Sequence, residues 1–227
     1  MTVLAAMQSA AVRLMGRKPQ TFFGGSGTFE IEIADLVNEV ADDIAKYRDW
    51  QALVRTASIG GDGVTTEYDL PDDYDRMPVS SEVMDLTSWG YIRFTDINTF
   101  LLAQSSGFTG TPGGWIIYAD KLRFSPAPSE PATFPYITKN WARAASEQPK
   151  SVFSLDTDTF LLPERLLTLG LVWRWREMKK LDASGDQEAF IKALDEYAAK
   201  DGGSRVQRRN SSRLFPGTRP AWPWELG

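Results

Sequence analysis

The sequence predicts an α+β protein in which helices from both ends of the chain form a bundle and a β-rich domain is inserted between them. Three observations support this prediction. Apolar residues recur at helical spacing near both ends, they alternate with polar residues in the middle, and the last residues follow neither period. We therefore expect bundle helices in residues 1–54 and 161–203, an inserted β-rich domain in residues 55–160, and an extended C-terminal tail in residues 204–227.

Two helices are expected before residue 55. The first begins after Thr2, a residue type that caps helix N-termini, and ends at Gly16. The second spans about residues 28–50, with an apolar stripe on one side and acidic residues around the other. The link FFGGSG at residues 22–27 has the glycines of a phosphate-cradling loop. Because it lacks the preceding strand and the GK[ST] ending of that motif, a flexible connection is the preferred interpretation.

The inserted domain is expected to contain short strands. TASIGGDGVTTEYDLP, residues 56–71, is interpreted as a hairpin that turns at Asp62 and Gly63, because these residue types accept positive φ. The sequence YADK, residues 118–121, predicts a second turn between two strands. The further predicted strands are residues 79–84, 91–94, 115–118, 121–124 and 134–138.

A short helix is expected within this domain at residues 95–107, capped by Thr95 and ended by Gly107. The loop that follows, GFTGTPGGW, is rich in Gly and Thr. It is interpreted as a surface loop in preference to a ligand cradle.

The segment LLPERLLTLGLVWRWREMKKL, residues 161–181, predicts a buried helix, and another helix is expected at about residues 186–200. WRWR places two Trp beside two Arg, as in proteins that bind single-stranded nucleic acid. Alternate residues of a helix do not share a face, so we expect Trp173 to face the core. Arg174 and Arg176 are expected to pair with acidic neighbours or to line a contact between subunits.

Composition excludes several classes of protein. A chain of 227 residues with 42% hydrophobic residues can bury a core. It has no Cys and no His, which excludes disulfides, Cys/His zinc sites and Ser-His-Asp or Cys-His catalytic sets. A hydrolase would have to use carboxylates, Lys or Tyr for proton transfer. The chain has no apolar run of about 18 residues and no segment in the order of a signal peptide, so we expect no membrane span and synthesis in a cytoplasm.

Carboxylates are candidates for two kinds of site. Asp156 and Asp158 alternate in SLDTDTFLLPE and could share a cation, but the third ligand and the Gly of a calcium loop are missing. We expect them instead to satisfy free N–H groups at the start of the next helix. Asp72, Asp73 and Asp75 are interpreted as a solvated turn. A glycosidase pair stays open, because sequence does not give the separation of carboxylates in space. We predict no metal, no cofactor and no catalytic residue.

The C-terminal tail has a charge opposite to that of the rest of the chain. Five Arg and Glu225 give residues 202–227 a net charge of +4, and since the whole chain carries −5, the remainder carries −9. A basic, aromatic tail on an acidic body is typical of a segment that binds another surface, and a disordered end that binds nothing is the alternative. The candidate docking residues are Arg205, Arg208, Arg209, Arg213, Phe215, Pro216, Trp222 and Trp224.

Three phrases, in this order, resemble the head-to-tail adaptor (connector) proteins of tailed bacteriophages. They are DWQALVRTASIGGDGVTTEYDLPDDYDRM, LRFSPAPSEPATFPYITKNW and FSLDTDTFLLPERLLTLGLVWRWREMKKLD, and the resemblance covers roughly residues 28–205. It implies a structural virion protein at the head-tail junction, assembled in the host cytoplasm and not an enzyme. It also implies a homo-oligomeric ring of about twelve copies. Such a ring docks beneath the portal protein, extends the DNA channel and provides a platform for the next tail or stopper component.

The resemblance further implies that genomic DNA passes through the ring without sequence-specific binding, and that the C-terminal segment reaches the portal. Two other functions remain open. The inserted domain could make the chain a tail-associated polysaccharide-binding or glycan-cleaving protein. Alternatively, the tail could clamp nucleic acid, with binding that weakens steeply as salt increases. The acidic pI of about 4.9 argues against a protein whose main surface grips nucleic acid.

Overall fold

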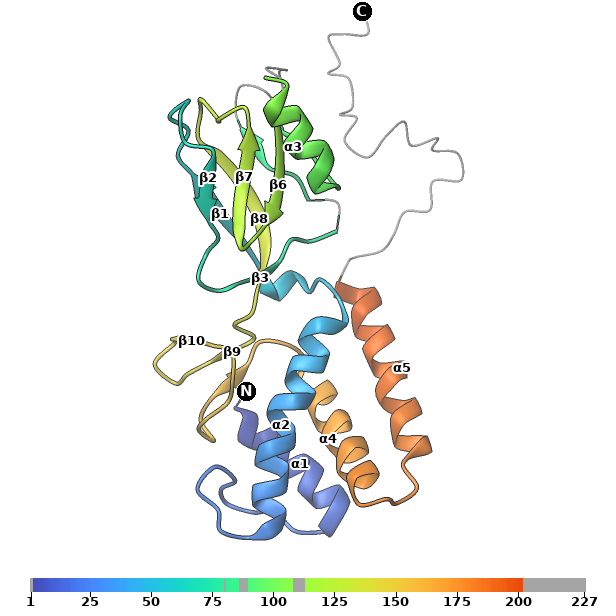
Figure 1. The fold of residues 1–227 in the computed structure, drawn as a ribbon. Helices are drawn as coiled ribbons and strands as arrows, with labels where there is room; N and C mark the ends of the chain where they lie inside the picture. Colours follow the sequence, from blue (N-terminus) through green and yellow to red (C-terminus); the bar gives the residue numbers. More distant parts are fainter. Residues whose placement is uncertain (1, 80, 86–89, 108–112, 202–227) are drawn as a thin grey trace, which may run out of the picture.

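A computed structural model describes residues 2–79, 81–85, 90–107 and 113–201. Four helices form one end of the molecule and a β-rich part forms the other, as Figure 1 shows. This arrangement confirms the predicted α+β fold class. The helices of the bundle are α1 (Val3–Met15), α2 (Thr28–Tyr47), α4 (Glu164–Met178) and α5 (Ser184–Asp201), and a 3-10 turn, Gln51–Leu53, leads from α2 into the β part.

Helix α4 is the centre of the bundle, because α1, α2 and α5 all pack against it. Its side chains Leu166, Leu167 and Leu171 are completely buried. Gly170 also lies on the buried side of α4, where Val40 of α2 and Phe190 of α5 approach the space that a Cβ would fill. The absence of a side chain at this position therefore lets two helices come close to α4 at the same level.

The β part consists of two sheets that share one core. In the first sheet, β8 (Ala132–Thr138) is the central strand and pairs with β1 (Val54–Ile59), β3 (Tyr74–Arg76) and β4 (Met84–Asp85). The second sheet has the order β2 (Glu67–Asp69), β7 (Lys121–Ser125), β6 (Gly114–Tyr118) and β5 (Ile92–Arg93), and only β5 and β6 run parallel. Helix α3 (Ile97–Ser105) packs beside β6.

Strand β8 also connects the two parts of the molecule. Phe134 and Tyr136 belong to the core between the sheets, whereas Ile137 belongs to the core of the helices. Successive residues of a strand point to opposite faces, so the change from one core to the other takes a single residue. The two cores therefore meet along β8.

A small third sheet lies against the helices. It contains β10 (Pro149–Lys150), β9 (Ala142–Arg143) and β11 (Thr159–Phe160). Trp141, Phe153 and Phe160 contact one another edge to face, and all three belong to the hydrophobic core of the helices. The last part of residues 55–160, which the sequence assigns to the inserted domain, thus packs in the helical core. The division of the chain into domains stays a prediction.

The predicted hairpin of residues 56–71 is wrong. Strand β1 pairs with β8 and β2 pairs with β7, so the two strands lie in different sheets. The local turn does form, because the Asp62 carboxylate accepts hydrogen bonds from the N–H groups of Val64 and Thr65 and Gly63 has φ 71°. Between the two strands the chain passes close to residue 130, since a Cβ on Gly61 would clash with the backbone of Glu130.

Two other local predictions were tested by the structure. The turn between β6 and β7 is confirmed, with positive φ at Ala119 (51°) and Asp120 (56°). The predicted cap of α3 is wrong by one residue, because the carboxylate of Asp96, and not the hydroxyl of Thr95, accepts a hydrogen bond from the N–H of Thr99. Asp and Thr cap helices in the same way, so the sequence does not decide between these adjacent residues. The choice depends on the residue at which the backbone turns from extended to helical, which is Asp96.

Candidate functional site

The Trp and Arg residues of α4 form the first candidate site. Trp173 stacks on Phe190 with ring centroids 5.4 Å apart, which confirms that it faces the core. The ring of Trp175 packs edge-on against Phe29, and its indole N–H donates a hydrogen bond to Glu32. Both Trp rings are thus held by the chain itself, an arrangement that does not offer the open stacking surface of a single-strand binder.

Both arginines of this segment pair with carboxylates of the same chain. Arg174 lies 2.7 Å from Asp43 of α2, and this hydrogen bond is the largest contribution to the raised pKa of the guanidinium. It also lies near Glu39 and Glu177. Arg176 pairs with Asp186 of α5 at 2.6 Å. The expected pairing with acidic neighbours is therefore observed, and a role of these arginines between subunits stays a prediction.

The FFGGSG link does bind an anionic group, but that group belongs to the chain. The carboxylate of Asp156 accepts hydrogen bonds from the backbone N–H groups of Phe22 (3.1 Å) and Phe23 (3.3 Å) and from the hydroxyl of Thr21. The side chain of Glu30 fills the space beside the glycines, where a Cβ on Gly27 would clash with it. A phosphate would meet two carboxylates here, so the link is a packed connection and no phosphate cradle.

Asp158 is a buried carboxylate with a structural role. Its side chain is completely buried, pairs with Lys150, and accepts hydrogen bonds from the backbone N–H groups of Ser154 (2.8 Å) and Leu155 (3.1 Å). Burial raises the pKa of a carboxyl group, but here the hydrogen bonds from Lys150, Ser154 and Leu155 outweigh it, and the pKa of Asp158 is lowered.

The prediction that Asp156 and Asp158 satisfy N–H groups at the start of α4 is wrong. The chain turns back at these residues, with the Asp158 N–H bonded to the Leu155 carbonyl, before β11 leads on to α4. The two carboxylates therefore face the α1–α2 link and the turn of residues 154–155. Within the described ranges, no group of three Asp or Glu side chains is placed to hold a metal ion.

The solvated-turn interpretation is wrong for Asp73. Its carboxylate accepts a hydrogen bond from the hydroxyl of Tyr136 and another from that of Thr138, each 2.7 Å long. Burial and the bond to Asp73 together raise the pKa of Tyr136 to about 12. Asp73 therefore holds the turn against the end of β8 through two hydrogen bonds.

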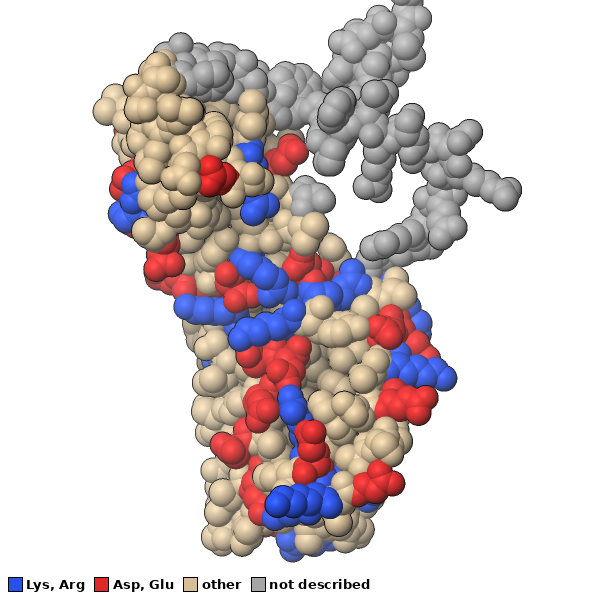
Figure 2. All heavy atoms as spheres, turned by 45° about the vertical axis from the view of Figure 1, so that its right-hand side comes forward, with Lys and Arg blue, Asp and Glu red and all other residues tan. Residues whose placement is uncertain are grey.

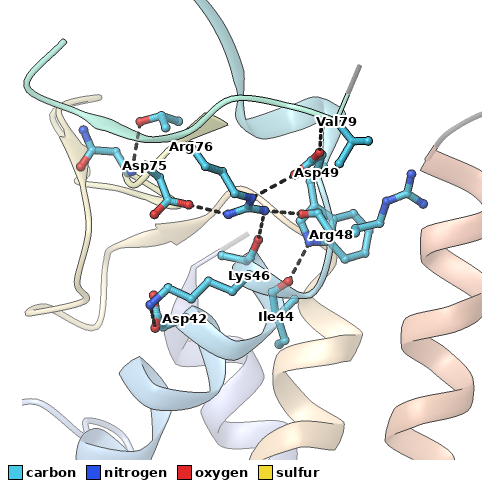
Figure 3. A network of polar contacts seen from close by, with 12 residues as sticks. Asp42, Ile44, Lys46, Arg48, Asp49, Asp75, Arg76 and Val79 are labelled. Atoms are coloured by element: carbon cyan, nitrogen blue, oxygen red, sulfur yellow. Dashed lines mark hydrogen bonds and ion pairs between the residues drawn. The ribbon is translucent and has the colours of Figure 1, made fainter. Parts of the chain in front are cut away.

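A polar junction between the helical and β parts surrounds Arg76, as Figure 3 shows. The Nε atom of Arg76 donates to Asp49 (3.0 Å), one Nη pairs with Asp75, and the other donates to the carbonyl of Arg48 (2.9 Å). Asp49 in turn accepts from the N–H of Val79 (2.9 Å). Arg76 comes from β3 and its main partners follow α2, so one guanidinium ties the two parts together. The sequence analysis missed this role, for which a lone Arg directly after Asp72, Asp73 and Asp75 was the available signal.

The family comparison covers both parts joined at this junction. The model of the SU10 adaptor protein family matches residues 1–216. The chain belongs to the SU10 adaptor protein family. This adaptor is thus a structural adaptor protein of a bacteriophage, which agrees with the resemblance found in the sequence. No curated protein matches the chain.

The predicted docking residues of this adaptor, from Arg205 to Trp224, lie outside the described residues. The last residue of α5, Asp201, accepts a hydrogen bond from the N–H of Gln51 (2.9 Å), so α5 ends at the junction with the β part. Figure 1 shows this end of α5 at mid-height of the molecule. In the part of the chain that the structure describes, no helix combines the length and the hydrophobicity needed to cross a bilayer.

Proposed function

We propose that this adaptor forms a homo-oligomeric ring beneath the portal protein at the head-tail junction of the virion. The ring extends the DNA channel and provides the platform to which the next tail or stopper component attaches. The family match over residues 1–216 is the observation that carries this proposal, since it identifies a phage structural adaptor. The net charge of −9 on residues 1–201 also supports it, because an acidic wall does not retain the phosphate backbone of passing DNA.

The C-terminal tail is the proposed portal-docking segment. Its arginines, Arg205, Arg208, Arg209 and Arg213, would pair with acidic grooves of the portal. Phe215, Trp222 and Trp224 would fill apolar pockets, and Pro216 would lower the entropy lost when the tail becomes ordered. Because a ring presents many tails at once, contacts that are weak individually give strong attachment.

Arg174 and Arg176 remain candidate residues of the ring contact. Both are partly exposed, with side-chain exposures of 27% and 37%, although each already pairs with carboxylates of its own chain. Any contribution to a neighbouring copy would therefore come from the exposed part of each guanidinium. The stabilisation that such an arginine gives to the ring contact is smaller than that from an unpaired charge.

Mass photometry of the portal ring from the same genome, mixed with this adaptor, tests the proposal. We expect the full chain to add a discrete number of copies to the portal. A full-length variant with Trp222→Ala and Trp224→Ala, and one in which Arg205, Arg208, Arg209 and Arg213 are replaced by Ser, should add fewer. Failure of the wild-type chain to add mass at any salt concentration would contradict the proposal.

A further inference from the structure

We infer that the contact between neighbouring copies joins the outer face of α5 in one copy to the outer face of α1 in the next. This inference rests on the proposed ring and specifies two surfaces that meet in it, in addition to the candidate residues Arg174 and Arg176 of α4. It is carried by two shallow grooves of opposite charge on different helices of the bundle.

The first groove, of about 550 Å³, runs along the outer face of α5. Helix α5 packs on α4 through Phe190 and Leu194, and the groove lies on other sides of the same helix, around Ile191, which is 47% exposed. The charged residues that line it are Glu188, Lys192, Asp195 and Glu196, which give a net charge of −2. Among the described residues, neither Glu188 nor Glu196 has an ionic partner.

The second groove, of about 320 Å³, lies on the outer face of α1. The exposed aliphatic side chain in this groove is Val12, which is 49% exposed, and the charged residues are Arg13 and Lys18. Neither cation pairs with a carboxylate of the described residues, whereas the nearby Arg17 is already paired with Glu30. Residues 1–29 contain no Asp or Glu at all, so no acidic side chain of this segment offsets the positive charge of the groove.

The two grooves are complementary in chemistry. Each has an exposed aliphatic side chain, Ile191 or Val12, beside charged groups, and the charges have opposite sign. Helices α1 and α5 both pack on α4, and Figure 1 shows α4 between them, so the grooves of one copy do not meet. The occupant of each groove is therefore a second copy of this chain.

Charge also decides the geometry of the contact. A symmetric contact of α5 with α5 would bring two net negative grooves together, and one of α1 with α1 would bring two positive grooves together. The favourable pairing is α5 with α1, which is heterologous and repeats from copy to copy until the ring closes. Figure 2 shows charged side chains concentrated from the junction downward over the helical part, with few on the visible face of the β part. The helical part therefore carries the charges that can specify such a pairing.

Disulfide trapping tests this contact in the full chain, because the natural sequence has no Cys. The variant Val12→Cys/Ile191→Cys is assembled on the portal, oxidised and analysed by non-reducing electrophoresis. We expect a ladder of covalent multimers that reduction converts to monomers. The matched controls are Val12→Cys and Ile191→Cys alone, which should stay monomeric because each lacks its partner. Monomers from the double variant, or equal cross-linking of a single variant, would overturn the inference.

A charge exchange gives an independent test with a positive outcome. Glu188→Lys/Glu196→Lys and Arg13→Glu/Lys18→Glu should each lose the ring, since the α5–α1 pairing becomes repulsive. An equimolar mixture of the two should regain the ring. When the two variants alternate, each reversed α5 face meets a reversed α1 face and each natural α5 face meets a natural α1 face, so every contact joins opposite charges. Glu130→Lys, an exposed change on the β part, is the matched control and should assemble like the wild type.

These outcomes separate the contact from the function. If the wild type forms rings on the portal and both charge-reversed variants do so undiminished, the α5–α1 contact is wrong and the proposed function stands. If the wild type forms no ring with or without the portal, both are wrong. Helical circular dichroism of each variant checks that the exposed substitutions leave the bundle folded. The contact should also weaken as salt screens the exposed charges.

Discussion

Replacing Gly170 by Ala is expected to destabilise the helical bundle, although Ala is the better helix former. Gly170 lies on α4 where α2 and α5 both approach. An added Cβ would clash with Cγ1 of Val40 and lie 3.1 Å from Cε2 of Phe190. Val40 is β-branched and only 1% exposed, so its side chain has little freedom to rotate away from the added Cβ.

Two opposing contributions determine the size of the effect. Overpacking a buried site costs about 1–3 kcal/mol, whereas Gly→Ala within a helix gains about 1 kcal/mol. The net loss should be up to about 2 kcal/mol, which corresponds to a fall in Tm of roughly 4–8 °C for a protein of this size. In a Val40→Ala background the clash with Val40 disappears, and Phe190 has to shift by only a few tenths of an ångström to admit the added Cβ. The same substitution at Gly170 should then stabilise the protein by up to about 1 kcal/mol.

Urea unfolding followed by helical circular dichroism measures all four proteins of this cycle. The control is Gly185→Ala in α5, where no atom beyond the adjacent residues and the backbone of the helix itself lies within 4 Å of the added Cβ, and it should be neutral or stabilising by a few tenths of a kcal/mol. A Gly170→Ala protein that unfolds at the same or a higher urea concentration than the wild type would refute the packing argument. So would the absence of a change in sign in the Val40→Ala background.

Three further predictions concern the polar contacts. The lowered pKa of Asp158 means that its carboxylate contributes stability above the unfolded value of 3.8 and loses it as pH falls through the lower folded value. Asp158→Asn should therefore lower the free energy of unfolding at neutral pH and flatten the acid side of its pH dependence, below the unfolded value of 3.8. Urea titrations across this range check this, and a wild-type pH dependence in the variant would contradict it. Arg76→Lys keeps the charge but loses most of the junction bonds and should cost about 1–3 kcal/mol in thermal unfolding. Arg55→Lys should cost little, because the hydrogen bonds of Arg55 to described residues go to the nearby carbonyls of Ala52 and Val54. Asp156→Ala leaves the N–H groups of Phe22 and Phe23 without their acceptor and should speed their hydrogen exchange, while Asp72→Ala, at an exposed position, should leave it unchanged.

The helices could be predicted because the pattern of apolar residues within each segment indicates both the helix and its buried side. The apolar stripe of α2 and the run of Leu in α4 define which side of each helix is buried before any partner is known. The turns at Gly63 and at Ala119–Asp120 were also readable, because local side-chain chemistry and positive φ favour them. These helices and turns could therefore be predicted from short segments of the sequence.

Strand partners and the roles of the carboxylates were decided only by the tertiary structure. Alternation in β1 specifies which residues face a core, but it does not distinguish β2 from β8 as the neighbour, since both satisfy the same period. Asp73, Asp156 and Asp158 each accept hydrogen bonds from groups whose positions depend on the completed fold. The sequence by itself thus determined the helices, the α+β class and the resemblance to phage adaptors. The pairing of strands, the junction at Arg76 and the opposed grooves on α1 and α5 required the fold, because they depend on distances between segments far apart in the chain.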